Sequence, residues 1–304
     1  MRALVYDPAA EFGVRFDEVD EPRPESSQAV IDVQAAAVNF GELAFTARQL
    51  RPGQVFGKDA AGVVARAAAD GSGPAVGTRV TSFAGTGGWA ERRAVDTADL
   101  AVIPDAVDPA AAAAVPAAGV TALQAVRRLG PLLGRRVLIT GASGGVGRYA
   151  VQLAARAGAH VIASVGRPER GAGLRELGAA EVVSGSTVPD EPVFGVLDNV
   201  GGAVLTEAFA TLEDGGLALS IGKAAREDTV IDFEQMRMRG GIRRLEPFTV
   251  SGPFGRDTGY LIELLSTGSL DPQLGWQGSW QRVHDAVDLL FSRQVQGKAV
   301  LTID

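Results

Sequence analysis

The chain has 304 residues, of which 46% are hydrophobic and 21% charged, a composition typical of globular proteins and unlike that of a disordered chain. It contains no cysteine and two histidines, which excludes disulfide bonds and thiolate zinc sites and predicts that no metal is bound. The net charge of −7 argues against a protein that binds the phosphate backbone of a nucleic acid.

The first hundred residues predict short strands separated by turns. Alternating apolar and β-branched residues follow a proline-rich spacer, and glycine-rich segments separate the later strands. The expected strands cover residues 3–6, 14–16, 29–35, 62–65, 79–82 and 89–93. Regular short strands with glycine turns are typical of a mostly-β barrel or sandwich.

After Pro104 the pattern changes to alternating helices and strands. Asp108 and Pro109 begin an alanine-rich helix, and a second helix ends near Gly130. Strands at 136–140, 160–164, 181–183, 195–200 and 216–221 then alternate with helical segments, of which 146–157 is the first. Repeated βα units predict a parallel sheet with helices on both faces. Two further helices and a strand at 299–303 close the chain.

A glycine-rich loop at 141–147 lies between a predicted strand and a predicted helix. Against the pattern G-x-G-x-x-G, Ala142 takes the first position, Gly144 the second and Gly147 the third. Glycines allow the backbone to approach a pyrophosphate, and the helix N-terminus attracts its negative charge. We therefore predict that Ala142, Ser143, Gly144, Gly145, Val146 and Gly147 bind a dinucleotide, with a purely structural turn as the alternative.

The end of the next strand indicates which nicotinamide cofactor enters. Ser164 is followed by Arg167 and Arg170, and the only nearby acid, Glu169, lies past Pro168 instead of at the strand tip, where NAD sites usually carry one. Guanidinium groups bind phosphate oxygens in a bidentate manner. The pattern predicts NADPH, with two solvated surface arginines as the alternative.

With this loop placed, the chain resembles the medium-chain dehydrogenase/reductase superfamily, in particular its zinc-less quinone oxidoreductase-like branch. The resemblance covers nearly the whole chain, and besides the loop its segments are 38–40, 57–64, 87–91, 111–126, 177–179, 197–202 and 297–301. It implies an α/β fold in which a Rossmann doubly wound parallel sheet, residues 113–251, is inserted in a mostly-β GroES-like distorted barrel, residues 1–112 and 252–304. Nicotinamide and substrate would lie between these domains.

The resemblance also implies roles for individual residues. Asn39 matches an asparagine beside the nicotinamide, where it would stabilise the charge that develops on the acceptor oxygen. Glu42 and Lys58 match positions near the same cleft and are candidate catalytic residues; a turn asparagine and structural ion pairs, also for Asp59, are the alternatives. Arg170 matches a residue that binds the 2′-phosphate. The remaining cofactor-binding residues that it implies are Thr121, Asn199, Val200, Ile221, Gly222 and Lys223.

One departure from the family bears on the chemistry. Many such reductases place tyrosines near the substrate, whereas this chain has Phe40 and Phe45 in the corresponding stretch. An obligatory tyrosine proton donor is therefore not supported. Reduction of a quinone needs no dedicated acid, because water can protonate the hydroquinone anion, whereas reduction of an enone requires a proton at carbon.

These observations together predict a metal-free, NADPH-dependent reductase that transfers a hydride to a quinone or another conjugated carbonyl acceptor. Two alternatives stay open: an enoyl reductase of secondary metabolism that acts on an α,β-unsaturated thioester or ketone, and a non-catalytic NADPH-binding sensor or structural protein. The chain lacks a run of about 20 apolar residues, and a charge follows Met1 too closely for a signal peptide, which predicts no membrane partner and a cytoplasmic protein. The resemblance implies a homodimer paired through an edge strand at 243–250.

Overall fold

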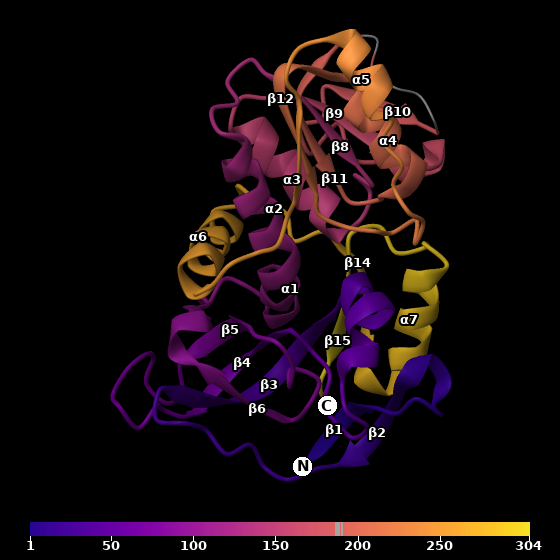
Figure 1. Cartoon of the computed structure of the whole chain (residues 1–304). Coiled ribbons are helices and arrows are strands. Elements are labelled where there is room, and N and C mark those ends of the chain that lie inside the picture. The colour runs from indigo at the N-terminus through magenta and orange to yellow at the C-terminus, as the bar shows by residue number, and fades with distance from the viewer. Residues whose placement is uncertain (186–188, 190) are drawn as a thin grey trace. The chain divides into compact units, whose positions relative to one another are not determined.

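The computed structural model, which describes residues 1–185, 189 and 191–304, divides into two compact units (Figure 1). The first unit comprises Met1–Val120 and Ser251–Asp304, and the second comprises Thr121–Val250. The sequence placed the first boundary after residue 112, within the helix α1 (Pro109–Ala114), whereas in the structure it lies within the helix α2 (Pro116–Leu129). The sequence placed the second boundary after residue 251, and in the structure it follows Val250.

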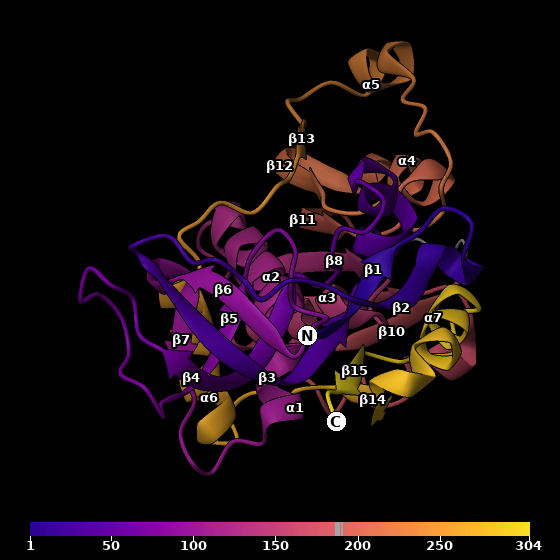
Figure 2. The same ribbon diagram turned by 90° about the horizontal axis from the view of Figure 1, so that it is seen from below.

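The first unit is mostly β-structure (Figure 2). Its strands are β1 (Arg2–Tyr6), β2 (Val14–Glu18), β3 (Gln28–Val38), β4 (Asp59–Arg66), β5 (Arg79–Phe83), β6 (Arg92–Asp96), β7 (Leu100–Val102), β14 (Leu274–Ser279) and β15 (Lys298–Thr302). The main sheet has the order β14-β15-β3-β4-β5-β7, with β6 also paired to β3, and β1 pairs with β2. Only the β14–β15 pair in it is parallel, which is typical of a sheet built from hairpins and long returns.

Short helices accompany these strands. They are α1 (Pro109–Ala114), the beginning of α2, α6 (Gly255–Ser266) and α7 (Val283–Phe291), with the single turns η1 (Glu11–Gly13), η2 (Glu42–Thr46), η3 (Ala47–Gln49), η4 (Thr97–Asp99) and η6 (Trp280–Arg282). The side chain of Asp108 caps α1 by accepting from the N–H of Ala110, as its position before Pro109 predicts.

One predicted strand of this unit begins later than expected, and two strands, β7 and β14, were not predicted. Residues 89–93 were expected as a strand, but β6 begins at Arg92. Trp89 is instead fully buried, and its indole N–H donates to the carbonyl of Ala37 (3.0 Å), so packing of the large ring decides its place. The strand β14 contains two glycines, which hide its β-character in the sequence.

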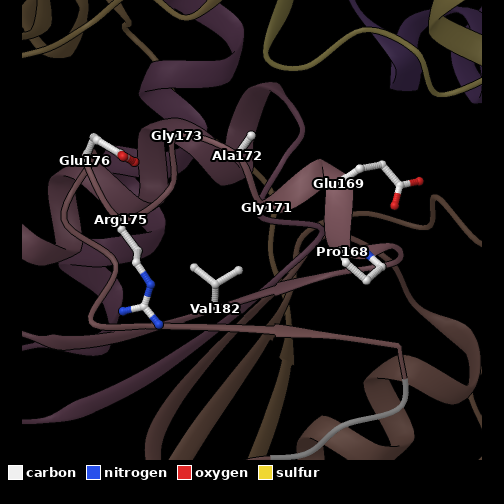
Figure 3. A pocket seen from close by; sticks show the side chains of 8 residues that line it. All are labelled: Pro168, Glu169, Gly171, Ala172, Gly173, Arg175, Glu176 and Val182. Atoms are coloured by element: carbon white, nitrogen blue, oxygen red, sulfur yellow. The ribbon is translucent and has the colours of Figure 1, made fainter.

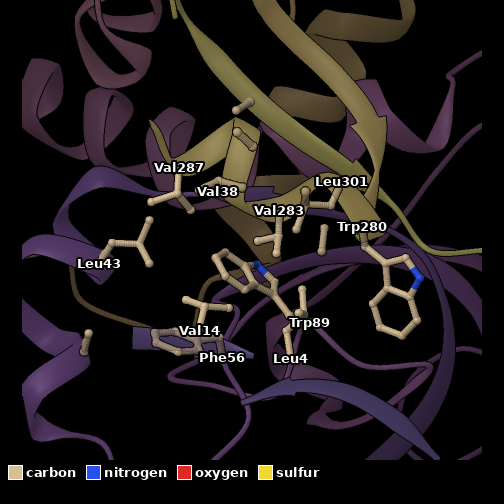
Figure 4. Close-up of a cluster of buried hydrophobic side chains, with 14 of the residues drawn as sticks. Leu4, Val14, Val38, Leu43, Phe56, Trp89, Trp280, Val283, Val287 and Leu301 are labelled. Atoms are coloured by element: carbon tan, nitrogen blue, oxygen red, sulfur yellow. The ribbon is translucent and has the colours of Figure 1, made fainter. Parts of the chain in front are cut away.

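A hydrophobic core fixes the end of β3 and the segment that follows it. Val38 and Leu43 both belong to the cluster around Leu4, Phe56 and Trp89, in which the Phe56 and Trp89 rings stack with centroids 5.3 Å apart (Figure 4). The α7 residues Val283 and Val287 complete this cluster, shown labelled with the others in the figure. Because Val38 and Leu43 are both packed in this core, the segment between them, which contains Asn39 and Glu42, is held in place at both ends.

The second unit is a parallel sheet flanked by helices. Its strands are β8 (Arg136–Thr140), β9 (His160–Val165), β10 (Glu181–Ser184), β11 (Val193–Asp198), β12 (Leu212–Ser220) and β13 (Arg244–Pro247), and its helices are the rest of α2, α3 (Gly145–Arg156), α4 (Gly202–Ala210), α5 (Phe233–Arg239) and the turn η5 (Pro168–Gly171). The strand order is β10-β9-β8-β11-β12-β13. Continuous apolar runs such as that of β8 suit strands buried on both faces.

The order of these strands reverses between β8 and β11. From β8 the chain proceeds outward to β9 and β10, and from β11 it proceeds in the other direction to β12 and β13. Right-handed crossovers therefore place α3 and α4 on opposite faces, as Figure 1 shows. The predicted α/β architecture, a doubly wound parallel sheet inserted into a mostly-β unit, is confirmed. No helix in the described part of the chain is long and apolar enough to span a bilayer.

Candidate functional site

The glycine loop lies at the carboxyl end of β8, beside the point at which the strand order reverses. Gly141 has a positive φ of +58°, which a side chain would disfavour. A Cβ atom on Gly147 would lie 2.4 Å from the carbonyl oxygen of Gly141 and 2.6 Å from the Cα of Ala142. Gly147 therefore allows α3 to pack directly on the loop, and the N-terminus of α3 opens toward the carboxyl edge of the sheet, where dinucleotides bind in such folds.

The structure brings the end of β9 and one predicted arginine to this loop. The N–H of Ala142 donates to the carbonyl of Ser164 (3.0 Å), and Arg170 Nε donates to Ser143 Oγ (2.9 Å). Arg167 lies one turn earlier, with a side chain 61% exposed and paired with Glu169 at 3.2 Å. Ser143, Ser164 and Arg170 are thus neighbours, whereas Arg167 is held by a carboxylate of its own segment.

The loop after β11 is fixed by a buried carboxylate that sequence reasoning did not single out. Asp198 is fully buried; it accepts hydrogen bonds from Thr140 Oγ1 (2.5 Å) and from the N–H of Gly201 (2.8 Å). Burial raises the pKa of Asp198, and these hydrogen bonds oppose the shift. The Asn199 amide donates to the carbonyl of Thr140 (2.9 Å), so it braces the loop from β8. An acid at the end of an apolar strand and before two glycines was the available signal.

The remaining predicted cofactor residues follow neighbouring elements. The N–H groups of Ile221 and Gly222, directly after β12, donate to the carbonyl of Asp198 (2.8 and 3.1 Å). Lys223 Nζ donates to Asp228 Oδ1 (2.6 Å). Val200 approaches the glycine loop, since a Cβ on Gly141 would lie 3.1 Å from its Cγ2 atom. Thr121 lies on α2, and its relation to these loops stays a prediction.

A surface hollow of about 370 Å³ lies beside η5 (Figure 3). It is lined by Pro168, Glu169, Gly171, Ala172, Gly173, Arg175, Glu176 and Val182. Arg175 donates to the carbonyl of Ala180 (2.7 Å), and neither predicted phosphate ligand lines the hollow. The cofactor prediction therefore rests on the strand ends and not on this hollow.

The first unit gathers the predicted catalytic asparagine and two charged side chains. Asn39 directly follows β3; its Nδ2 donates to Asp59 Oδ2 (3.0 Å), and its Oδ1 accepts from Lys298 Nζ (2.6 Å). Asp59 Oδ1 accepts the N–H of Ala117 (2.9 Å). The side chains of Lys298 and Asp59 are 3% and 0% exposed, and burial lowers the pKa of Lys298 while Asp59 opposes the shift. Asp59 begins β4 and is not a loop residue, and Lys298 was not predicted as a site residue.

Glu42 is a buried carboxyl beside this cluster. Its Oε1 accepts the N–H of Gly57 (2.7 Å), and its Oε2 is buried without a hydrogen bond among the described residues. Burial raises the pKa of Glu42 to about 7, with Asp59 adding to the shift and Lys58 opposing it. Lys58 itself is half-buried and precedes β4. Glu42 makes no ion pair in the described part of the chain, whereas Asp59 Oδ2 lies 3.6 Å from Lys298 Nζ.

Phenylalanine rings cluster in the segment that follows Asn39. The Phe40 ring meets those of Phe45 and Phe291 edge to face, with centroids 6.0 and 5.8 Å away. Phe45 is 39% exposed. This segment presents apolar aromatic surface and no phenol.

Two family models match the chain. The alcohol dehydrogenase GroES-like domain matches residues 25–105 and the zinc-binding dehydrogenase matches residues 145–252. Among the described residues, no group of three or more histidine, aspartate or glutamate side chains is placed to hold a metal ion. The first match lies in the mostly-β unit, so the predicted GroES-like character of that unit is confirmed.

The chain aligns with a small part of one relative and with nearly the whole of another. Erythronolide synthase EryA2 of Saccharopolyspora erythraea is 34% identical over 283 aligned positions, which cover 84% of this chain and 8% of the synthase. The chain spans 8% to 12% of the length of this and similar polyketide synthases. The acryloyl-coenzyme A reductase of Metallosphaera sedula is 26% identical over 328 positions, with 95% of this chain and 96% of that protein covered.

Solved structures share the fold along its whole length. The quinone oxidoreductase of Coxiella burnetii has a TM-score of 0.86 at 25% identity, and the alignment covers 100% of this chain and 99% of that one. The Escherichia coli quinone oxidoreductase, solved with NADPH, has a TM-score of 0.87 at 20% identity, with 99% and 100% covered.

A GroES-like unit joined to a doubly wound sheet with a glycine loop defines the alcohol-dehydrogenase class of fold. The chain belongs to the medium-chain dehydrogenase/reductase superfamily, in its quinone oxidoreductase-like branch, as the sequence motifs predicted.

Proposed function

We propose that the chain is an NADPH-dependent reductase that transfers a hydride to a conjugated carbonyl acceptor, with a quinone as the first candidate. The observation that carries the proposal is the contact between Arg170 and Ser143, which places a guanidinium on the glycine loop at the strand-order reversal. The E. coli quinone oxidoreductase, which shares this fold, was solved with NADPH, and this supports the choice of cofactor.

The residues of the second unit fit a dinucleotide. The space that a Cβ on Gly147 would fill is occupied by the loop backbone, so the loop is shaped by its own packing before any ligand arrives. The N–H groups of Gly145, Val146 and Gly147, at the N-terminus of α3, would hold the pyrophosphate, and Arg167 and Arg170 the 2′-phosphate. Ser164, Thr121, Asn199, Val200, Ile221, Gly222 and Lys223 would line the rest of the cofactor. When bound, NADPH supplies the hydride and the protein supplies orientation and exclusion of water.

The acceptor side of the proposal rests on the amide of Asn39. An N–H donor held in place stabilises negative charge on a carbonyl oxygen more strongly than water does, because it does not have to reorient. Asn39 would donate a hydrogen bond to the acceptor oxygen. Glu42 and Lys58 are candidates to donate or accept the proton that accompanies hydride transfer. The aromatic faces of Phe40 and Phe45 suit a planar, apolar acceptor.

An enoyl thioester reductase is the second candidate. It is favoured by Glu42, whose pKa of about 7 leaves a substantial fraction of the carboxyl protonated at neutral pH, as delivery of a proton to carbon requires. The similarity to an acryloyl-coenzyme A reductase along nearly its whole length points the same way.

For both candidate functions we infer a homodimer that pairs through β13, an edge strand of the parallel sheet. Light scattering, which measures the mass of the particle in solution, tests this inference.

A panel of acceptors separates these functions. The purified chain is titrated with NADPH and with NADH by fluorescence, and NADPH oxidation is then followed with simple quinones and with crotonyl-coenzyme A. We expect tight NADPH binding and faster oxidation with quinones. Faster oxidation with the thioester supports the second candidate. NADPH binding without oxidation by any acceptor supports a sensor, and absence of nicotinamide binding overturns all three.

A further inference from the structure

We propose that Lys298 and Asp59 are positioning residues that hold the amide of Asn39 in a single orientation and leave its second N–H for the acceptor oxygen. The proposal rests on the proposed function, because it assigns these residues a part in the same site. It adds two residues, 239 positions apart in a chain of 304 (298 − 59 = 239), that no motif links.

The chemistry of the two neighbours fixes which way the amide points. The ammonium of Lys298 can only donate hydrogen bonds, and the carboxylate of Asp59 can only accept them. The observed contacts obey this rule, with Lys298 Nζ 2.6 Å from Oδ1 and Asp59 Oδ2 3.0 Å from Nδ2. A flipped amide would place N–H groups against the ammonium and an oxygen against the carboxylate. The orientation is therefore determined by charge, and not by shape alone.

The distances indicate that the amide, and not the ion pair, is the centre of the cluster. Lys298 Nζ lies 3.6 Å from Asp59 Oδ2, which is longer than the contact that either residue makes with Asn39. A buried pair that serves stability alone is expected to make its shortest contact within the pair, since direct attraction must offset desolvation. Here each charge lies nearer to the amide than to the other charge, and the two still form an ion pair.

The sheet register places these three residues side by side. Ala299 pairs with Val38 and Ala60 pairs with Ala36, so β15 and β4 flank the end of β3. Lys298 and Asp59 are the first residues of β15 and β4, and Asn39 follows the last residue of β3. Asp59 is fixed further by the N–H of Ala117 in the first turn of α2. The positions of both charges are thus set by backbone hydrogen bonds.

The ammonium also changes the strength of the amide as a donor. A charge-assisted hydrogen bond to Oδ1 draws electron density from the amide, and neighbouring hydrogen bonds strengthen one another in a low-dielectric site. One N–H is taken by Asp59. The second N–H is directed to the Glu42 carboxyl, whose pKa the hydrogen bond from Asn39 lowers, and it would donate instead to an acceptor oxygen on which charge develops.

The sequence offers a direct spectroscopic test, because Asn39 and Asn199 are its only asparagines. Protein labelled with ¹⁵N-asparagine gives two side-chain amide pairs, and Asn39→Ala assigns them. We expect Lys298→Met and Asp59→Ala, neither of which adds an asparagine, each to shift the Asn39 amide signals and leave those of Asn199 in place. Arg92→Met, which breaks a surface ion pair in the same unit, is the matched control. Asn39 signals that stay unchanged in both variants overturn the proposal, whether or not the protein turns over any acceptor.

A kinetic cycle tests the consequence for the reaction. Asn39→Ala should lower kcat about 100-fold in the wild-type background but less than about 3-fold in Lys298→Met, because both changes remove the same donor. The KM for NADPH should stay the same, and Lys298→Arg should restore part of kcat. If Lys298→Met does not fold, Lys298→Gln carries the same cycle. Equal losses from Asn39→Ala in the two backgrounds contradict the positioning role, whereas a wild type without turnover counts against the proposed function alone.

Discussion

The candidate acceptor residues of the first unit and the candidate cofactor residues of the second unit are built in opposite ways. On the acceptor side, Asn39 is held by buried side chains of opposite charge whose strands are locked by sheet register. On the cofactor side, the loop at 141–147 is shaped by backbone packing, and its arginines include Arg167, whose side chain is 61% exposed. The first arrangement is rigid before any ligand binds, and the second combines a rigid loop with a long side chain that can reorient. We therefore expect substitutions in the rigid parts to have larger effects on stability and binding than substitutions of the arginine side chains.

The largest effect is expected at the rigid part of the cofactor side. Gly147→Ala adds a Cβ 2.4 Å from a backbone oxygen, which the loop cannot accommodate without moving. We expect a loss of about 3 kcal/mol in the free energy of unfolding and a weakening of NADPH binding by about 100-fold. Denaturant unfolding and a fluorescence titration measure both quantities. Gly166→Ala is the matched control, because its Cβ would meet no atom within 4 Å. Equal behaviour of the two variants would show that the loop is not shaped by this contact.

On the acceptor side, the buried carboxyl of Glu42 should make the stability of the folded chain depend on pH. The pKa of Glu42 is about 7 in the folded chain, against an ordinary value of 4.5, so between these pH values the native state retains a proton that the unfolded state has released. Stability should therefore fall as pH rises through this range, by about 3 kcal/mol from this group.

Glu42→Gln checks this expectation, because the neutral amide cannot titrate. Relative to wild type, the variant should gain stability between about pH 5 and about pH 8, as measured by denaturant unfolding at each pH. Glu25→Gln, at an exposed carboxyl, serves as the control and should leave the pH dependence of wild type unchanged. A wild-type slope that persists in Glu42→Gln would assign the effect to another group.

The smallest effects are expected at Arg167 and Arg170, the two arginines that follow β9. Arg170→Ala should weaken NADPH binding about 10-fold and leave NADH binding unchanged, because only the 2′-phosphate distinguishes the two cofactors. Arg167→Ala should cost less, about 3-fold, since Arg167 must first leave Glu169. Fluorescence titration with both cofactors measures these differences, with Arg175→Ala as the control. Losses that are equal for NADH and NADPH would remove the assignment to the 2′-phosphate.

The same division explains what the sequence could predict. The glycine loop is contiguous, and its meaning depends only on a strand before it and a helix after it, so its place at the end of β8 could be read from residues 136–157. The alternation of strands and helices likewise gave the parallel sheet. Asn39 was found through resemblance to a family and not through its spacing.

The acceptor-side cluster could not be assembled from sequence. Asn39 and Lys298 are 259 residues apart and meet only because β15 returns to pair with β3. Asp198 was missed for a related reason, since its partner Thr140 lies on another strand, 58 residues earlier. Local patterns report periodicity and turns, whereas the pairing of distant strands depends on the whole sheet.

Direct hydride transfer from NADPH can be tested by a single-turnover measurement with NADPH deuterated at C4. With the best acceptor of the panel, we expect slower oxidation for one of the two C4-deuterated forms and an unchanged rate for the other, because a specific site would bind the nicotinamide by one face. Oxidation at the same rate with both forms, or NADPH binding with no oxidation by any acceptor, would contradict it.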